Sequence, residues 1–193
     1  KNVIVYNAAT LYVEVVRGIP MIVLILYFAY ALIPFVVDGV HGLGNLGLSL
    51  APGSGFFNGM ASMSIRTIPT EVRGILALAL GYGAFEAEVF RAGIQSIGKG
   101  QMEAAKSLGM TYLQAMRFVI LPQAIRRVLP PLGNDFIAML KDSALLTVLA
   151  INELTQLSRL RRASTFQIMV TFNVTAFMYL SMTLILSAGV RWL

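Results

Sequence analysis

An acidic side chain in the middle of a long apolar stretch is the first sign of chemistry in this sequence. Glu86 lies between Arg73 and Gln95, and Tyr82 precedes it by about one helical turn, so the two would share a helix face. An ionisable group inside a membrane span costs roughly 2.5–3.5 kcal/mol on insertion scales and usually faces a protein interior or an aqueous cavity. We therefore predict that both residues line a path and that Glu86 is the counter-ion of a cationic side chain. The alternative is that Glu86 pairs with a basic residue from another helix.

A second polar group follows a pair of prolines. Pro130 and Pro131 remove two backbone donors, so we expect the helix around them to be broken or kinked and to leave carbonyl groups free. Asn134 and Asp135 come directly afterwards and could bind the α-amino or carboxylate group of a substrate, as discontinuous transporter helices do. We assign both residues to the same path.

Four more ionisable residues have either a structural role or a role in the path. Glu88 and Arg91 are three residues apart and can form an ion pair that holds the end of their helix, which is the interpretation we favour. Lys141 and Asp142 could contribute to the path or pair with other helices, and the sequence leaves both open.

The composition requires lipid as the solvent for much of the chain. Of its 193 residues, 57% are hydrophobic and 12% are charged, whereas an ordinary soluble domain has about 25% charged residues. The mean hydropathy is +0.75. The net charge of +6 comes without a basic stripe interleaved with aromatics, so it indicates topology signals and anionic headgroup contacts, and we expect no nucleic-acid partner. There is no cysteine, which excludes disulfides and a Cys-ligated metal site, and we expect no metal.

Four stretches are long and apolar enough to cross a membrane, which needs about 20 residues each. They cover residues 19–37, 73–95, 124–150 and 168–190, and they predict an all-α, polytopic transmembrane helical bundle in a single domain. Residues 38–72 are rich in turn signals and are expected to form a long loop, with room for a short interfacial helix. Residues 97–121 have the composition of a soluble helix-turn-helix excursion.

Basic residues orient these spans. With the chain start, the excursion and the C-terminus on one side, nine Lys and Arg residues fall on that side and five on the other, which favours the first side as cytoplasmic. Three of the five, Arg159, Arg161 and Arg162, form a cluster that opposes this orientation.

Two glycine patterns imitate nucleotide-binding motifs. Residues 42–47 match G-x-G-x-x-G but have no preceding strand, and residues 93–99 nearly match a phosphate-binding loop but place Gly100 where Ser or Thr is needed. We therefore expect no nucleotide or other cofactor to bind this chain directly. The single histidine, His41, is expected to be a surface residue.

The segment from Gly100 to Gly109 reads GQMEAAKSLG and predicts a short helix that ends at Gly109. Ala104, Ala105 and Leu108 would give it an apolar face of small residues that fits a groove in another protein, flanked by Glu103 and Lys106. An ordinary amphipathic loop helix is the alternative.

This segment, followed by Leu121-Pro122, closely resembles the EAA loop of membrane subunits of ATP-binding-cassette importers. Further matches to the polar amino-acid branch lie at residues 12–20, 87–97 and 121–143, so the resemblance covers roughly residues 10–155. It implies that Gly100, Glu103, Ala104, Ala105, Leu108 and Gly109 form a cytoplasmic coupling helix seated on an ATPase subunit.

The resemblance also implies the setting of the chain. It would be a multi-pass subunit of the bacterial cytoplasmic (inner) membrane that imports polar amino acids, with a preference for basic ones suggested by Glu86. Its partners would be a second permease subunit, ATPase subunits that carry ATP and Mg²⁺, and an extracytoplasmic binding protein. A fifth span, usual in this branch, is expected upstream of the first residue. An ion-coupled secondary transporter or channel that uses intramembrane carboxylates remains the main alternative.

Overall fold

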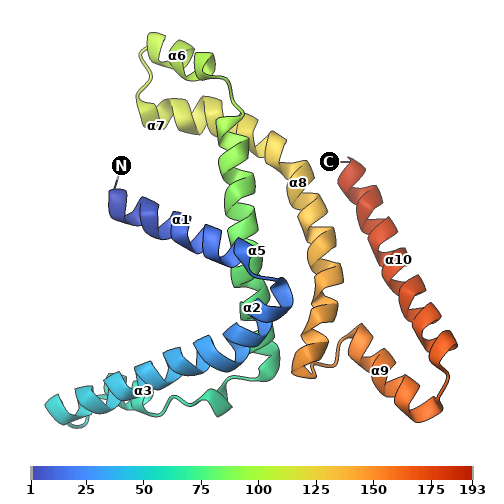
Figure 1. The fold of residues 1–193 in the computed structure, drawn as a ribbon. Coiled ribbons are helices and arrows are strands. Elements are labelled where there is room, and N and C mark those ends of the chain that lie inside the picture. Colours follow the sequence, from blue (N-terminus) through green and yellow to red (C-terminus); the bar gives the residue numbers. More distant parts are fainter. Residues whose placement is uncertain (1, 193) are drawn as a thin grey trace.

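The computed structural model describes residues 2–192, and in that part of the chain every regular element is a helix (Figure 1). The order is α1 (Val3–Gly18), α2 (Met21–Tyr27), η1 (Phe28–Leu32), α3 (Ile33–Leu50), α4 (Gly55–Ala61), η2 (Ile65–Thr67), α5 (Thr70–Gln95), α6 (Lys99–Ser107), α7 (Tyr112–Ala115), η3 (Met116–Ile120), α8 (Leu121–Asp142), η4 (Ser143–Leu149), α9 (Leu154–Thr165) and α10 (Ile168–Trp192). The segments η1 and η3 are π-helical, and η2 and η4 are 3₁₀.

Helices α5 and α8 form the centre of the structure. They pack against each other, while α1 and α2 cover α5 and α10 covers α8 (Figure 1). Their close approach depends on Gly93, because a Cβ atom there would lie 2.1 Å from Cγ1 of the buried Val128. The main hydrophobic core lies where α1, α2, η1, α5 and η4 meet, and includes Ile25, Ala29 and Ala77.

The helix that begins at Met21 runs without interruption through η1 to Leu50. The expectation of a loop from residue 38 is therefore wrong for residues 38–50, and the short helix expected in this region is α4. The glycines that suggested turns make a helix contact instead: a Cβ on Gly44 would lie 2.3 Å from the backbone N of Ala61, and one on Gly47 would lie 2.1 Å from the ring of Phe57. The G-x-G-x-x-G pattern thus lies in α3, where two of its glycines pack against α4.

The predicted helix-turn-helix between residues 97 and 121 is present. Helix α6 ends as expected: Gly109 has φ +81°, its N–H donates to the carbonyl of Lys106, and the N–H of Met110 donates to the carbonyl of Ala105. A capping box at Thr111 and Gln114 then starts α7. From Tyr112 to Asp142 the chain is helical throughout.

The expected break at the proline pair does not occur. Pro130 and Pro131 lie inside α8, which curves along its length but continues to Asp142 (Figure 1). A helix can tolerate missing donors where neighbouring elements support it, and here α5 and α10 both pack against α8.

Two helices in the described residues are long and apolar enough to span a membrane: Met21–Leu50, with mean hydropathy 2.3, and Ile168–Trp192, with mean hydropathy 1.7. Helices α5 and α8 have 26 and 22 residues but carry the ionisable side chains discussed above. Helix α6 and both chain ends lie toward one end of the structure, whereas α4 and α9 lie toward the other (Figure 1).

Candidate functional site

A hydrogen bond joins the two central helices at a polar cluster. The Tyr82 hydroxyl on α5 donates to Oδ2 of Asp142 at the end of α8, across 2.9 Å. The Tyr82 side chain is buried, and Asp142 is half-buried. The structure thus brings together two predicted residues that are 60 positions apart in the chain.

Glu86 lies one turn further along α5 on the same face. The residue is half-buried, and its Oε2 atom is buried without a hydrogen-bond partner. Asp135 lies on α8, the helix that packs against α5. A buried carboxylate oxygen without a donor is unfavourable, so Oε2 of Glu86 is open to a hydrogen-bond donor or a cation.

In residues 2–192, no basic side chain forms a salt bridge with Glu86, Asp135 or Asp142. The one salt bridge found in the described residues joins Arg91 Nη1 and Glu88 Oε1 at 3.4 Å, between side chains that are about one third exposed. The predicted pairing of Glu88 and Arg91 is therefore present. Asn134 and Lys141 are exposed, so they differ in setting from the half-buried Asp135 and Asp142.

Helix α6 and the chain around the start of α8 pack together beyond the end of α5. Ile97, Ile120 and Ala124 make a small core of their own, with Met102 and Met116 packed against it. The Gln123 side chain donates to Gln101 Oε1 at 3.3 Å. These contacts connect α6 to the start of α8, the helix that carries Asp135 and Asp142.

The six predicted coupling residues do not all face outward. Ala105 is buried against its own chain, whereas Gly100, Glu103, Ala104 and Leu108 are exposed, Leu108 to 80%. Ala104 and Leu108, four residues apart, therefore form the outward apolar face, and Ala105 attaches the helix to its base.

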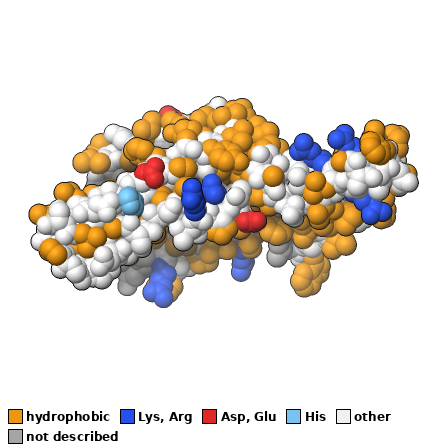
Figure 2. Space-filling view, turned by 90° about the horizontal axis from the view of Figure 1, so that it is seen from below, with side chains coloured by type: hydrophobic (Ala, Val, Ile, Leu, Met, Phe, Trp, Pro, Cys, Tyr) orange, Lys and Arg blue, Asp and Glu red, His pale blue; other side chains and the backbone are white. Residues whose placement is uncertain are grey.

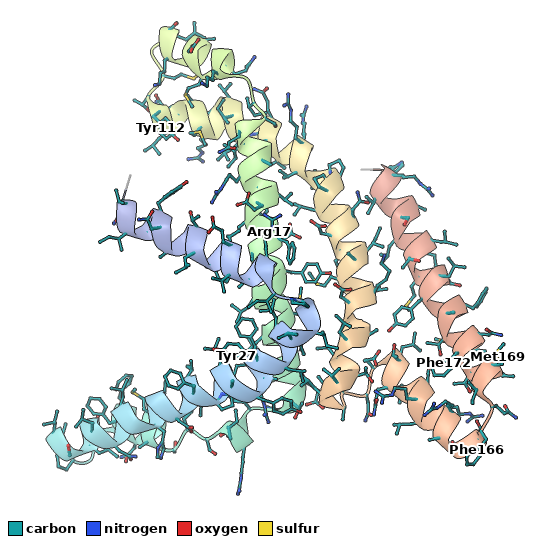
Figure 3. The ribbon with its side chains drawn as sticks, viewed as in Figure 1. Arg17, Tyr27, Tyr112, Phe166, Met169 and Phe172 are labelled. Atoms are coloured by element: carbon teal, nitrogen blue, oxygen red, sulfur yellow. The ribbon has the colours of Figure 1, made fainter. Side chains whose placement is uncertain are left out.

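Apolar side chains beside α6 extend this face. Tyr112, Leu113 and Phe118 are 60%, 77% and 63% exposed, and Figure 3 shows Tyr112 at the start of α7. Beside them, a surface hollow of about 310 Å³ is lined by Leu108, Gly109 and Phe118, together with Met110 and Gln114. Exposed apolar patches of this kind mark interaction sites.

Some polar contacts were not anticipated from the sequence. The Tyr12 hydroxyl donates to the carbonyl of Leu80 and fastens α1 to α5. Glu153 caps the start of α9 and also accepts a hydrogen bond from Tyr179 on α10 at 3.2 Å. For the contact between Glu153 and Tyr179, the sequence offered one signal, the hydroxyl of Tyr179 inside the last apolar stretch. His41 is exposed, as predicted, next to Asn45.

The match to a family model defines the class of protein. Residues 1–193 match the family described as "Binding-protein-dependent transport system inner membrane component". The chain therefore belongs to this family, and it is a permease subunit of an ATP-binding-cassette importer for amino acids, not a catalytic subunit.

Individual relatives point to the same branch. The chain is 40% identical over 184 residues to the probable glutamine ABC transporter permease protein GlnM of Bacillus subtilis (strain 168), covering 95% of this chain and 72% of the relative. It is 32% identical over 185 residues to the glutamine transport system permease protein GlnP of Escherichia coli (strain K12), covering 96% and 72%. A crystal structure of an amino acid ABC transporter with histidines matches with a TM-score of 0.73 at 37% identity, covering 95% of this chain and 72% of the other.

Proposed function

We propose that α5 and α8 line the path of an amino acid through the membrane and that Glu86, with Asp135, favours a cationic side chain. The observation that carries the proposal is the buried Oε2 atom of Glu86, which has no hydrogen-bond partner in the described residues. A guanidinium or ammonium group would neutralise the two carboxylates and supply the missing donors. The hydrogen bond between Tyr82 and Asp142 would join the two helices that line the path.

The names of two relatives refer to glutamine, which is neutral and polar. This supports import of a polar amino acid in general, and the acidic cluster is our reason for proposing a basic one. The polar groups of Asn134 and Lys141 are exposed on α8, and we keep both as candidates for contacts with the substrate or the second permease subunit.

Transport would be driven from α6. We propose that Ala104 and Leu108 sit in a cleft of an ATPase subunit that binds ATP and Mg²⁺, with the α6 end in the cytoplasm. The family name implies a binding protein, which would deliver the amino acid on the opposite side. A second permease subunit, identical or related, would complete the path. Membership of a binding-protein-dependent family favours this scheme over an ion-coupled carrier.

The test compares Glu86→Gln with a matched control, Glu88→Gln, in the full transporter reconstituted with its ATPase and binding protein. Glu88 lies on the same helix but already has Arg91 as its partner. A hydrogen bond to a charged group contributes about 1.5–3 kcal/mol, so Glu86→Gln should slow arginine uptake about tenfold or more. Glutamine uptake should change much less, and Glu88→Gln should affect both substrates slightly. Equal loss of arginine and glutamine uptake in Glu86→Gln would remove the counter-ion role.

A further inference from the structure

Helix α9 carries a basic cluster that the transport scheme leaves unexplained. Arg159, Arg161 and Arg162 are all exposed, at the end of the structure opposite α6 (Figure 1). Arg159 is engaged, because its Nη1 donates to Thr147 Oγ1 at 3.2 Å. In the described part of the chain, the Arg161 guanidinium has neither a hydrogen bond nor a salt bridge. Figure 2, which views the structure from below, shows basic side chains standing among hydrophobic ones.

Arg161 borders a groove between α9 and α10. The groove has a volume of about 430 Å³, and Gln167 lies beside it where the chain turns from α9 into α10. Val170, Val174 and Met178 follow along the groove at successive turns of α10. The cationic Arg161 and the polar Gln167 therefore lie at one end of a mainly apolar groove.

Two of the three hydroxyl groups in the groove have partners within the protein. Ser158 Oγ and Thr175 Oγ1 lie within hydrogen-bond distance of each other and of the carbonyls of Leu154 and Thr171 respectively, so their two hydrogens are shared among these acceptors. These two hydroxyls offer a ligand little hydrogen bonding. The third hydroxyl is that of Thr171. Apart from Arg161, Gln167 and the Thr171 hydroxyl, the groove thus presents a mainly apolar wall to whatever occupies it.

The dimensions of the groove fit one leaflet of a membrane. From Gln167 to Met178 the helix rises about 16 Å at 1.5 Å per residue. That is roughly half of the ~30 Å hydrocarbon core. Phe166 and Met169, which are 85% and 74% exposed, lie at the same end as Arg161 (Figure 3). An aromatic ring is common at the level of the lipid headgroups.

We propose that this groove binds one phospholipid with an anionic headgroup. Its phosphate would pair with Arg161, and an acyl chain would lie along Val170, Val174 and Met178. The side of the membrane opposite α6 has fewer basic residues than the α6 side. Binding of a lipid headgroup gives Arg161 a role on that side other than orienting the chain in the membrane. This site goes beyond the proposed transport function and involves none of the residues of the path or of α6.

The test uses the purified full transporter, delipidated and titrated with phosphatidylglycerol or phosphatidylcholine under native mass spectrometry. The wild type should bind one phosphatidylglycerol per permease subunit more tightly than phosphatidylcholine. Arg161→Gln should weaken phosphatidylglycerol binding about fivefold, since one arginine near an anionic lipid contributes about 1 kcal/mol. The matched control, Arg162→Gln, alters the next residue, which does not line the groove, and should keep the preference.

A substitution that fills the groove tests the contact with the acyl chain separately from the contact with the headgroup. Val174 is 54% exposed, so Val174→Phe can be accommodated, and it should weaken binding of both lipids. The proposal fails if the wild type binds phosphatidylglycerol and phosphatidylcholine equally well. It also fails if no lipid binds at a fixed stoichiometry, as expected if another protein surface covers the groove. It also fails if Arg161→Gln and Arg162→Gln weaken binding equally. If Arg161→Gln leaves lipid binding intact but raises the amount of binding protein needed to stimulate ATP hydrolysis, the arginine serves protein docking instead.

Discussion

Replacing Gly109 with alanine should weaken the attachment of the ATPase to this chain. Gly109 has φ +81°, and no atom lies within 4 Å of the position that a Cβ would take, so the strain in Gly109→Ala comes from the backbone alone. A left-handed conformation costs a non-glycine residue about 1–2 kcal/mol. The last turn of α6 can relieve this strain by unwinding, which releases the carbonyls of Ala105 and Lys106 and displaces Leu108.

The affinity between purified permease and ATPase subunits measures this effect. A cost of 1–2 kcal/mol corresponds to a change of about 5- to 30-fold in an equilibrium constant, so the Kd should rise by about fivefold or more. Gly98→Ala is the matched control, because Gly98 precedes α6 as its N-cap, also in open space, but has φ −56° and is not among the six coupling residues. An alanine adopts this conformation without strain, so the Kd should stay nearly the same. Equal affinities for both variants would refute the role assigned to the end of α6.

Two other substitutions test the centre of the structure. Gly93→Ala places a Cβ 2.1 Å from Val128 and should destabilise the permease by about 1–3 kcal/mol, seen as a lower thermal unfolding midpoint. Adding Val128→Ala should recover part of the loss, and a double variant no more stable than Gly93→Ala would place the strain elsewhere. Tyr82→Phe leaves the Asp142 carboxylate without its donor, a loss of about 1.5–3 kcal/mol, and should slow uptake several-fold in vesicles. Unchanged uptake would show that this pair is not part of the path.

The sequence predicts the helical elements better than their ends. Long, largely apolar stretches correctly indicated the helices α5, α8 and α10, although α5 and α8 carry ionisable side chains, and Gly109 correctly marked the end of α6. The stretch after residue 37 was misjudged because glycine serves two purposes. At Gly44 and Gly47 it allows α3 and α4 to pack closely, and a single sequence does not distinguish this use from a turn.

The candidate site was predictable along each helix but not between helices. A spacing of four residues placed Tyr82 and Glu86 on one face, and a spacing of three predicted the Glu88–Arg91 pair. The Tyr82–Asp142 hydrogen bond depends on how α5 packs against α8, which no local pattern encodes. The burial of Ala105 has the same origin, because the side of α6 that faces its own chain is decided by the core beneath it.

The most direct test of the central claim is uptake of labelled arginine into proteoliposomes that contain the full transporter, with and without ATP at the face where the ATPase lies. Excess unlabelled glutamine is added as a competitor. We predict uptake that requires ATP and persists in glutamine. Uptake that requires ATP but is abolished by glutamine would keep the importer and remove the basic preference. Uptake driven by an ion gradient without ATP would contradict the account.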